Sequence, residues 1–311
     1  MRLPQRISAA RGSGGHRYSR DILQHAVNRH QHRLAVLMAR RKRAAAITGD
    51  TWCDKRVATA DIHADGLVFT AEMYGVQLDQ LAVALGVPER RAAALAAKWT
   101  SSGFADAARL GPGSRWVWLT RTGLARCGLP YTPVAPALSR LAHLRAVTAV
   151  RLALTATPQF AGAQAFWRSE RRLRARFGRK IGLREHIPDG EVHWPDGASA
   201  GLPGTDVAWA GECWAIEAEL TPKTLAKTVT VMREVLARTG DYGCASADVT
   251  VPGRLPRHAR VIYLCSPAAW PVVGRARDSI GGLAARVEIR MLPPDALYSP
   301  HSPSAVARRA P

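Results

Sequence analysis

Cysteine is scarce in this chain, and none of its five cysteines is placed to form a paired motif. Cys53, Cys127, Cys213, Cys244 and Cys265 are scattered, their number is odd, and no C-x-x-C occurs. A disulfide framework and a zinc ribbon are therefore not expected, whereas a reducing compartment is.

Long apolar runs are also lacking. No stretch approaches the roughly 20 apolar residues of a membrane span, and the basic N-terminus is not followed by the apolar core of a signal peptide. We therefore expect a cytoplasmic protein with no membrane partner.

The sequence lacks the motifs of two classes of enzyme, the P-loop ATPases and the tyrosine relaxases. No G-x-x-x-x-G-K-[ST] is present, so a P-loop ATPase is excluded. The close histidine pair that a tyrosine relaxase would need occurs only as His30 and His32, in a polar segment that makes a poor metal cradle.

Acidic residues are few. The chain has 24 Asp and Glu against 44 Lys and Arg, a formal net charge of +20. Because clustered cations bind phosphate polyanions, double-stranded DNA is the expected partner. The length of 311 residues suits two domains, and the composition leaves a homodimer open.

The first segment, residues 1–64, is basic and polar, with the run Arg40, Arg41, Lys42 and Arg43. We expect a partly disordered arm that contacts DNA phosphates or is simply solvated.

Residues 65–128 are expected to form a winged helix-turn-helix domain. Apolar residues at helical spacing predict helices before Gly75, over 78–85 and over 89–101; a hairpin follows at 104–109 and 116–119, and a last helix is capped by Thr120. Basic side chains at the start of the third helix and beside the wing turn are typical of groove and phosphate contacts. The predicted DNA-binding residues are Arg90, Arg91, Lys98, Arg109 and Arg115.

Three prolines in residues 129–136 indicate a linker. Residues 137–295 then alternate helices and strands, which favours a mixed α/β core, and 296–311 are expected to be a disordered tail. Helices are predicted over 137–155, from 166 to Gly178, over 222–238 and over 270–277; strands are predicted at 184–194, 205–209, 212–220, 261–265 and 287–292.

The stretch CWAIEAELTPK at 213–223 is the most informative in the chain. Glu217 and Glu219 share one face of a strand, and Thr221 and Pro222 would begin a helix that places Lys223 beside them. Paired carboxylates near a lysine suit a divalent-metal phosphodiester site, although acidic strand ends are commonly just solvated.

Asp189, in HIPDG, is the expected first acid, and Asp206, in GTDVAW, is its rival. With Glu217 and Glu219 it resembles the P-D…(D/E)-x-K arrangement of restriction-endonuclease-like nucleases. The strand position of the lysine is occupied by Glu219 or Thr221, so the lysine would come from Lys223 or Lys227.

Three stretches together, HLRAVTAVRLAL at 143–154, WRSERRLR at 167–174, and HIPDG…IEAELTPK at 186–223 followed by VIYLC, resemble the replication-relaxation family of actinobacterial plasmids and mobile elements. The resemblance covers roughly residues 65–280. It implies plasmid-type DNA binding with a restriction-endonuclease-like α/β domain, linked to replication or transfer.

The sequence therefore predicts a DNA-binding protein of a plasmid or mobile genetic element. The first alternative is a Mg²⁺- or Mn²⁺-dependent endonuclease or nickase, with Asp189, Glu217 and Glu219 as metal ligands and Lys223 as the fourth catalytic residue. The second alternative is a transcriptional regulator.

Overall fold

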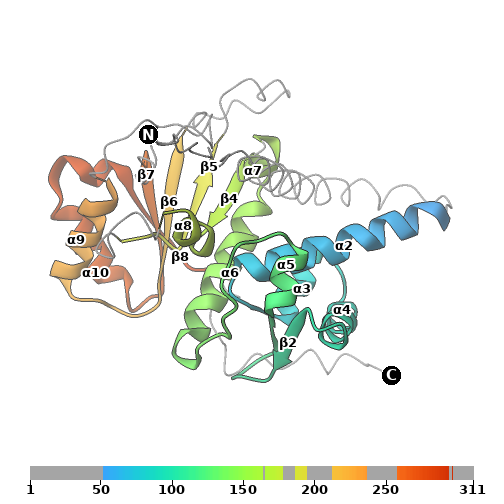
Figure 1. Ribbon diagram of the computed structural model, residues 1–311. Coiled ribbons are helices and arrows are strands. Elements are labelled where there is room, and N and C mark those ends of the chain that lie inside the picture. The colour runs from blue at the N-terminus through green and yellow to red at the C-terminus, as the bar shows by residue number, and fades with distance from the viewer. Residues whose placement is uncertain are drawn as a thin grey trace, which may run out of the picture.

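The structure, a computed structural model, describes residues 52–163, 165–177, 186–194, 212–236, 258–293 and 296. The fold is mixed α+β, with two sheets and helices around them (Figure 1). Within these residues no helix is both long and apolar enough to cross a bilayer. The expected arm up to residue 51 and the expected tail from 297 lie outside the described residues.

The N-terminal unit consists of four helices and a small antiparallel sheet of order β1-β3-β2. Its elements are α2 (Trp52–Glu72), β1 (Val76–Gln77), α3 (Leu78–Leu85), α4 (Glu89–Ser101), β2 (Ala105–Ala108), β3 (Trp116–Leu119) and α5 (Arg121–Arg126). Three helices, a hairpin and a final helix therefore follow one another in the expected order.

Local chemistry explains these boundaries. Gly75 and Gly86 have φ of 134° and 57°, conformations that glycine adopts without strain, and they follow α2 and α3. The Thr120 hydroxyl accepts the Gly123 N–H as an N-cap, as predicted. α2 begins earlier than expected, because the sequence has no glycine or proline between Trp52 and Gly66. The domain boundary expected between residues 64 and 65 therefore lies inside this helix.

The second unit is built on a five-stranded sheet of order β4-β5-β6-β7-β8. Its elements are η1 (Leu138–Arg140), α6 (Leu141–Thr155), α7 (Pro158–Gly162), β4 (Phe166–Ser169), α8 (Glu170–Phe177), β5 (Gly190–His193), β6 (Cys213–Glu219), α9 (Leu225–Leu236), β7 (Arg260–Cys265), α10 (Trp270–Asp278), η3 (Gly281–Arg286) and β8 (Val287–Met291). β5 is antiparallel to both of its neighbours, whereas β6, β7 and β8 are parallel.

Alternation along β6 divides its side chains between two layers. Trp214, Ile216 and Ala218 face the core that includes α6, and Ala215 faces the core beneath α9 and α10. Figure 1 shows α9 and α10 on one side of the sheet and α6 on the other. Glu217 and Glu219 therefore lie on the α9 and α10 side.

Two predictions about these elements were wrong. Residues 166–169 form a strand and not part of a helix, because they pair along β5 and bury Trp167. α9 begins at Leu225, where the Thr224 hydroxyl accepts the Lys227 N–H, so Thr221 is not the cap and Lys223 precedes the helix. The strand predicted at 205–209 and its Asp206 lie outside the described residues.

The two units share a continuous hydrophobic core, which runs from Leu67 through α6 to Leu264. Polar contacts reinforce the junction. The carboxylate of Glu72 accepts hydrogen bonds from Ser169 (2.5 Å) and Tyr131 (2.7 Å). The N-terminal unit is therefore packed against the sheet unit and not merely tethered to it by residues 129–136.

Candidate functional site

The predicted acids lie at the carboxyl end of β6. Asp189 directly precedes β5, whose first residue, Gly190, pairs with Ile216, and Glu217 pairs in register with Tyr263 on β7. This edge is where the parallel strands β6 and β7 end, a common location for sites in α/β sheets. The side chains of Asp189, Glu217 and Glu219 are 13%, 3% and 7% exposed.

Asp189 is held by two donors. One carboxylate oxygen lies 2.8 Å from His143 Nε2, and the other accepts the Ala218 backbone N–H at 2.9 Å. Burial alone would raise the pKa of Asp189, but its hydrogen bond and charge interaction with His143 outweigh burial and hold the pKa below the usual value. Asp189 is therefore ionised and fixed between α6 and β6.

Glu217 is paired with a second histidine. Its Oε1 lies 2.6 Å from His186 Nε2. Burial raises the pKa of Glu217, opposed mainly by His186, and the nearby charge of Asp189 raises it further. Burial would lower the pKa of His186, but the charge and hydrogen bond of Glu217 together with the charge of Asp189 raise it.

Glu219 forms an ion pair with Lys223 Nζ. Burial would lower the pKa of Lys223, but Glu219 outweighs it, and the charges of Glu217 and Asp189 act in the same direction. Lys223 is thus close enough for the charges of all three predicted acids to raise its pKa. Lys227, the other lysine considered, is exposed in the first turn of α9.

Tyr263 on β7 lies beside Glu217, with which it pairs in register. Its hydroxyl is buried without a hydrogen-bond partner, and burial, followed by the charges of Glu217 and Glu219, raises its pKa well above the usual value. An unpartnered buried hydroxyl is uncommon. We refer to Asp189, Glu217, Glu219 and Lys223, with His143, His186 and Tyr263, as the acid–lysine centre.

The three predicted metal ligands do not close into a compact cage. Of the described residues, only Glu191, His193 and Cys213 bring three ligand atoms within 4.8 Å of one another. Asp189, Glu217 and Glu219 are instead each paired with a basic side chain.

His143 and His186 were not predicted as site residues, although both stand at the start of stretches that carry the family resemblance. His143 begins HLRAVTAVRLAL, and His186 precedes Asp189 by three residues. Their side chains are 29% and 26% exposed, so they and Lys223, at 37%, open the acid–lysine centre to solvent.

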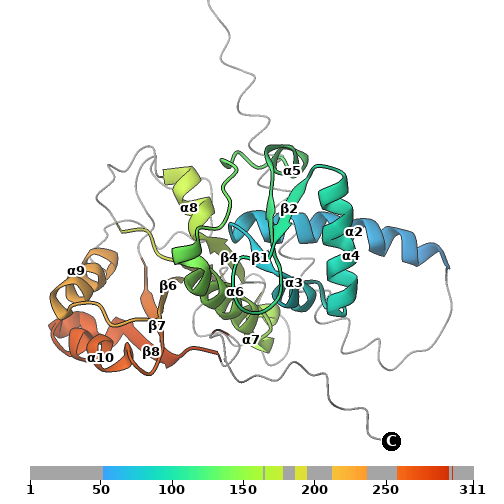
Figure 2. The same cartoon turned by 90° about the horizontal axis from the view of Figure 1, so that it is seen from below.

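The predicted DNA-binding residues lie on the surface of the N-terminal unit. In residues 62–128 every arginine and lysine is exposed, while Asp65 and Glu72 are buried. The exposed cations are Arg90, Arg91, Lys98, Arg109, Arg115, Arg121 and Arg126. Leu95 and Trp99 fix the inner face of α4, as predicted. Figures 1 and 2 both show α4 on the side of the molecule far from α9 and α10.

No protein-family model, curated protein or solved structure matches this chain. What it does must therefore be inferred from its own residues.

Proposed function

We propose that this protein binds double-stranded DNA through the N-terminal unit, acting as a winged helix-turn-helix. The supporting observation is the excess of positive charge on the surface: in residues 62–128 all seven Arg and Lys side chains are exposed, whereas only two acids, Glu89 and Asp106, are exposed. An exposed cationic surface is what attracts phosphate and releases its counterions.

The geometry of α4 supports this proposal. Pro88 is at its N-cap and Glu89 begins the helix, so Arg90 and Arg91 lie in its first turn. In helix-turn-helix proteins the N-terminal residues of the second helix of the motif contact base edges and phosphates. The turn between β2 and β3 carries Arg109 and Arg115 at the edge of the same unit.

A titration of a fluorescently labelled duplex of mixed sequence tests this function. We expect the fluorescence anisotropy to rise with protein, and the affinity to weaken steeply as salt increases, because each phosphate contact contributes about one unit to the slope of log K against log salt. An anisotropy that stays flat at low salt would refute the proposal.

We also propose that the sheet unit cleaves a phosphodiester bond as a restriction-endonuclease-like domain. The observation that favours this second function is the ion pair between Lys223 and Glu219, which brings a lysine to the acids even though the strand carries none. An acid before β5, two acids on β6 and this lysine together match the P-D…(D/E)-x-K resemblance.

The donor atoms suit Mg²⁺ or Mn²⁺. Mg²⁺ commonly takes only one or two carboxylates and completes its shell with water and substrate phosphate, so Asp189 and Glu217 suffice without the closed cage. Such an ion would polarise the phosphodiester and neutralise developing charge.

The remaining roles belong to side chains of the chain itself. Lys223 would orient the attacking water and bind the phosphate as a point charge. The water oxygen forms the new bond to phosphorus while the bond to the departing sugar oxygen breaks. His186, which is 26% exposed, would take the water proton, and solvent water would protonate the departing oxygen. His143 would keep Asp189 ionised and oriented.

Nicking of supercoiled plasmid in Mn²⁺ tests this second function. We expect relaxed circles from the wild type and none from Glu217→Gln, which keeps the side-chain shape but lacks the charge. Duplex binding by Glu217→Gln should be unchanged. Duplex binding by the wild type without any nicking would refute cleavage and leave DNA binding standing.

The family resemblance further suggests a role in the replication or transfer of a plasmid or mobile element, and a homodimer would match the symmetry of a palindromic site. Transcriptional control remains the alternative if binding occurs without cleavage.

A further inference from the structure

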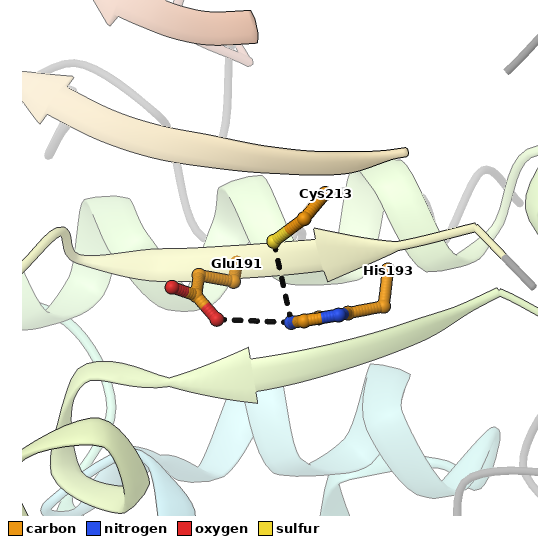
Figure 3. Close-up of side chains that lie close together, drawn as sticks. All are labelled: Glu191, His193 and Cys213. Carbon is orange, nitrogen blue, oxygen red and sulfur yellow. Dashed lines mark hydrogen bonds and ion pairs between the residues drawn. The ribbon is translucent and has the colours of Figure 1, made fainter. Parts of the chain in front are cut away.

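Away from the acid–lysine centre, three metal-ligating side chains converge inside the sheet. Glu191 and His193 lie on the same face of β5, and Cys213, which starts β6, is paired in register with His193. His193 Nε2 is 2.9 Å from a Glu191 oxygen and 3.4 Å from the Cys213 sulfur. Figure 3 shows the three side chains pointing toward one another.

One ordinary hydrogen bond from the His193 ring does not link all three side chains. One imidazole nitrogen faces both a carboxylate and a thiol, and its single N–H can be donated to only one of them. If that nitrogen carries the proton, it can donate to Glu191 but cannot accept from the Cys213 thiol; if it carries none, the contact with Glu191 has no proton between two acceptors. A cation at the centre would accept a lone pair from all three atoms.

We propose that Glu191, His193 and Cys213 bind a Zn²⁺ ion. Zinc prefers thiolate, imidazole and carboxylate ligands at about 2.0 to 2.3 Å, which in a tetrahedron separates the ligand atoms by roughly 3.3 to 3.6 Å. The three ligand atoms all lie within 4.8 Å of one another. The 3.4 Å between His193 and Cys213 already matches this tetrahedral separation, and the 2.9 Å between His193 and Glu191 would have to lengthen by a few tenths of an ångström.

The surroundings resemble the outer shell of a metal site. His258 Nε2 lies 2.8 Å from the second oxygen of Glu191, and Arg168 Nη1 lies 4.0 Å from the first. Phe166 stacks on the His193 ring at 4.8 Å between centroids, with 7° between the planes. Such contacts orient ligands and are typical of protein metal centres.

Burial indicates a structural role for this ion. Glu191 and His193 are 0% exposed and Cys213 is 1% exposed, so the thiol is closed to any substrate as a nucleophile. The zinc would clamp β5 to β6, and His258 would extend the link to the start of β7. Cys213 and Glu219 stand at opposite ends of β6, roughly 20 Å apart at about 3.3 Å per residue, so this site is distinct from the acid–lysine centre.

Metal analysis of the full-length protein, reconstituted with Zn²⁺ and desalted, tests the proposal. We expect about one zinc per chain, and replacement by Co²⁺ should give a sulfur-to-cobalt charge-transfer band in the near ultraviolet. The band shows that a thiolate binds the metal, and because Cys265 pairs with Glu219 beside the acid–lysine centre, cysteine variants decide which thiolate it is. Protein that retains no metal, or cobalt protein without the band, would overturn the proposal.

Matched variants locate the ion. Cys213→Ser should lose the sulfur band, whereas Cys265→Ser, a buried cysteine on β7 outside the triad, should keep it. A folded Cys213→Ser protein that keeps the band would overturn the assignment. If Cys213→Ser does not fold, His258→Ala provides the test: it should weaken zinc binding by about 10- to 100-fold, and unchanged zinc affinity would contradict the proposed site.

Discussion

Lys223 and Lys227 are four positions apart, and the sequence left the choice between them open. The structure separates them because α9 begins only at Leu225. Lys223 therefore lies in the preceding segment and pairs with Glu219, while Lys227 is exposed on the helix. The lysine could not be assigned from the sequence because the start of a helix fixes which way each side chain points.

This assignment predicts a difference between two alanine variants. Lys223→Ala should abolish plasmid nicking, because it removes the residue that orients the water and binds the scissile phosphate, but it should retain duplex binding through the N-terminal unit. Lys227→Ala, a matched loss of one charge, should nick like the wild type. Agarose gels of supercoiled plasmid measure nicking by both variants. Loss of nicking in Lys227→Ala together with wild-type nicking in Lys223→Ala would assign the role to Lys227 instead.

His63 provides a test of pH dependence away from the acids. Trp99 Nε1 donates to His63 Nδ1 at 3.0 Å. Burial lowers the pKa of His63, and the charges of Lys98 and Arg91 lower it further. As pH falls, His63 is therefore protonated in the unfolded chain before it is protonated in the folded protein. Its contribution to the free energy of unfolding is complete above about pH 6.5 and is lost as the pH falls below that value.

We expect the His63 contribution to the free energy of unfolding to be larger at about pH 7.5 than at about pH 5.5. In His63→Gln the amide oxygen can still accept from Trp99 but does not titrate, so urea unfolding of this variant should lose less stability over the same interval. An equal loss in both proteins would show that His63 titrates normally.

At the scale of helices and strands, the elements that could be predicted are those whose ends are marked by glycine or proline. α4 at Glu89–Ser101 and β3 at Trp116–Leu119 match the expected ranges, because Pro88, Gly103 and the Gly-Pro-Gly turn mark their ends. β4 was missed because its basic continuation favours a helix, and only pairing with β5 makes residues 166–169 a strand. That pairing is a tertiary contact that local propensity does not contain.

Two glycines test how tightly these elements are packed. A Cβ at Gly123 in α5 would lie 1.9 Å from the Phe104 carbonyl oxygen, a backbone atom that cannot turn away, whereas a Cβ at Gly274 in α10 meets nothing within 4 Å. Gly123→Ala should cost more than about 1 kcal/mol of unfolding free energy. Gly274→Ala should gain up to about 1 kcal/mol from helix propensity. Denaturant unfolding measures both, and equal effects would contradict the packing of α5.

At the scale of the molecule, the sequence predicted two domains and a linker, and it placed the acids correctly before β5 and on β6. It could not supply their partners, because His143 and Asp189 are 46 residues apart and meet only when α6 packs on the sheet. The shared core was also not predicted, because an apolar helix face does not identify its neighbour.

The shared core predicts that both units unfold together. Glu72→Gln should destabilise the protein by about 1.5 to 3 kcal/mol, because it removes a charged acceptor of the hydrogen bonds from Ser169 and Tyr131. Circular dichroism should show one transition, and hydrogen exchange should show α3 and β7 becoming less protected together. Two separated transitions in the wild type would contradict the single unit.

The salt dependence of duplex affinity, measured on two matched variants, tests the central claim most directly. Arg90→Ala with Arg91→Ala changes the exposed start of α4, and Arg275→Ala with Arg277→Ala removes the same charge from α10 on the far side of the molecule. We predict that the α4 variant binds more weakly and that its slope of log K against log salt falls by up to about two units, while the α10 variant keeps the wild-type slope. An unchanged slope in a folded α4 variant, or an equal fall in both variants, would contradict DNA binding through α4.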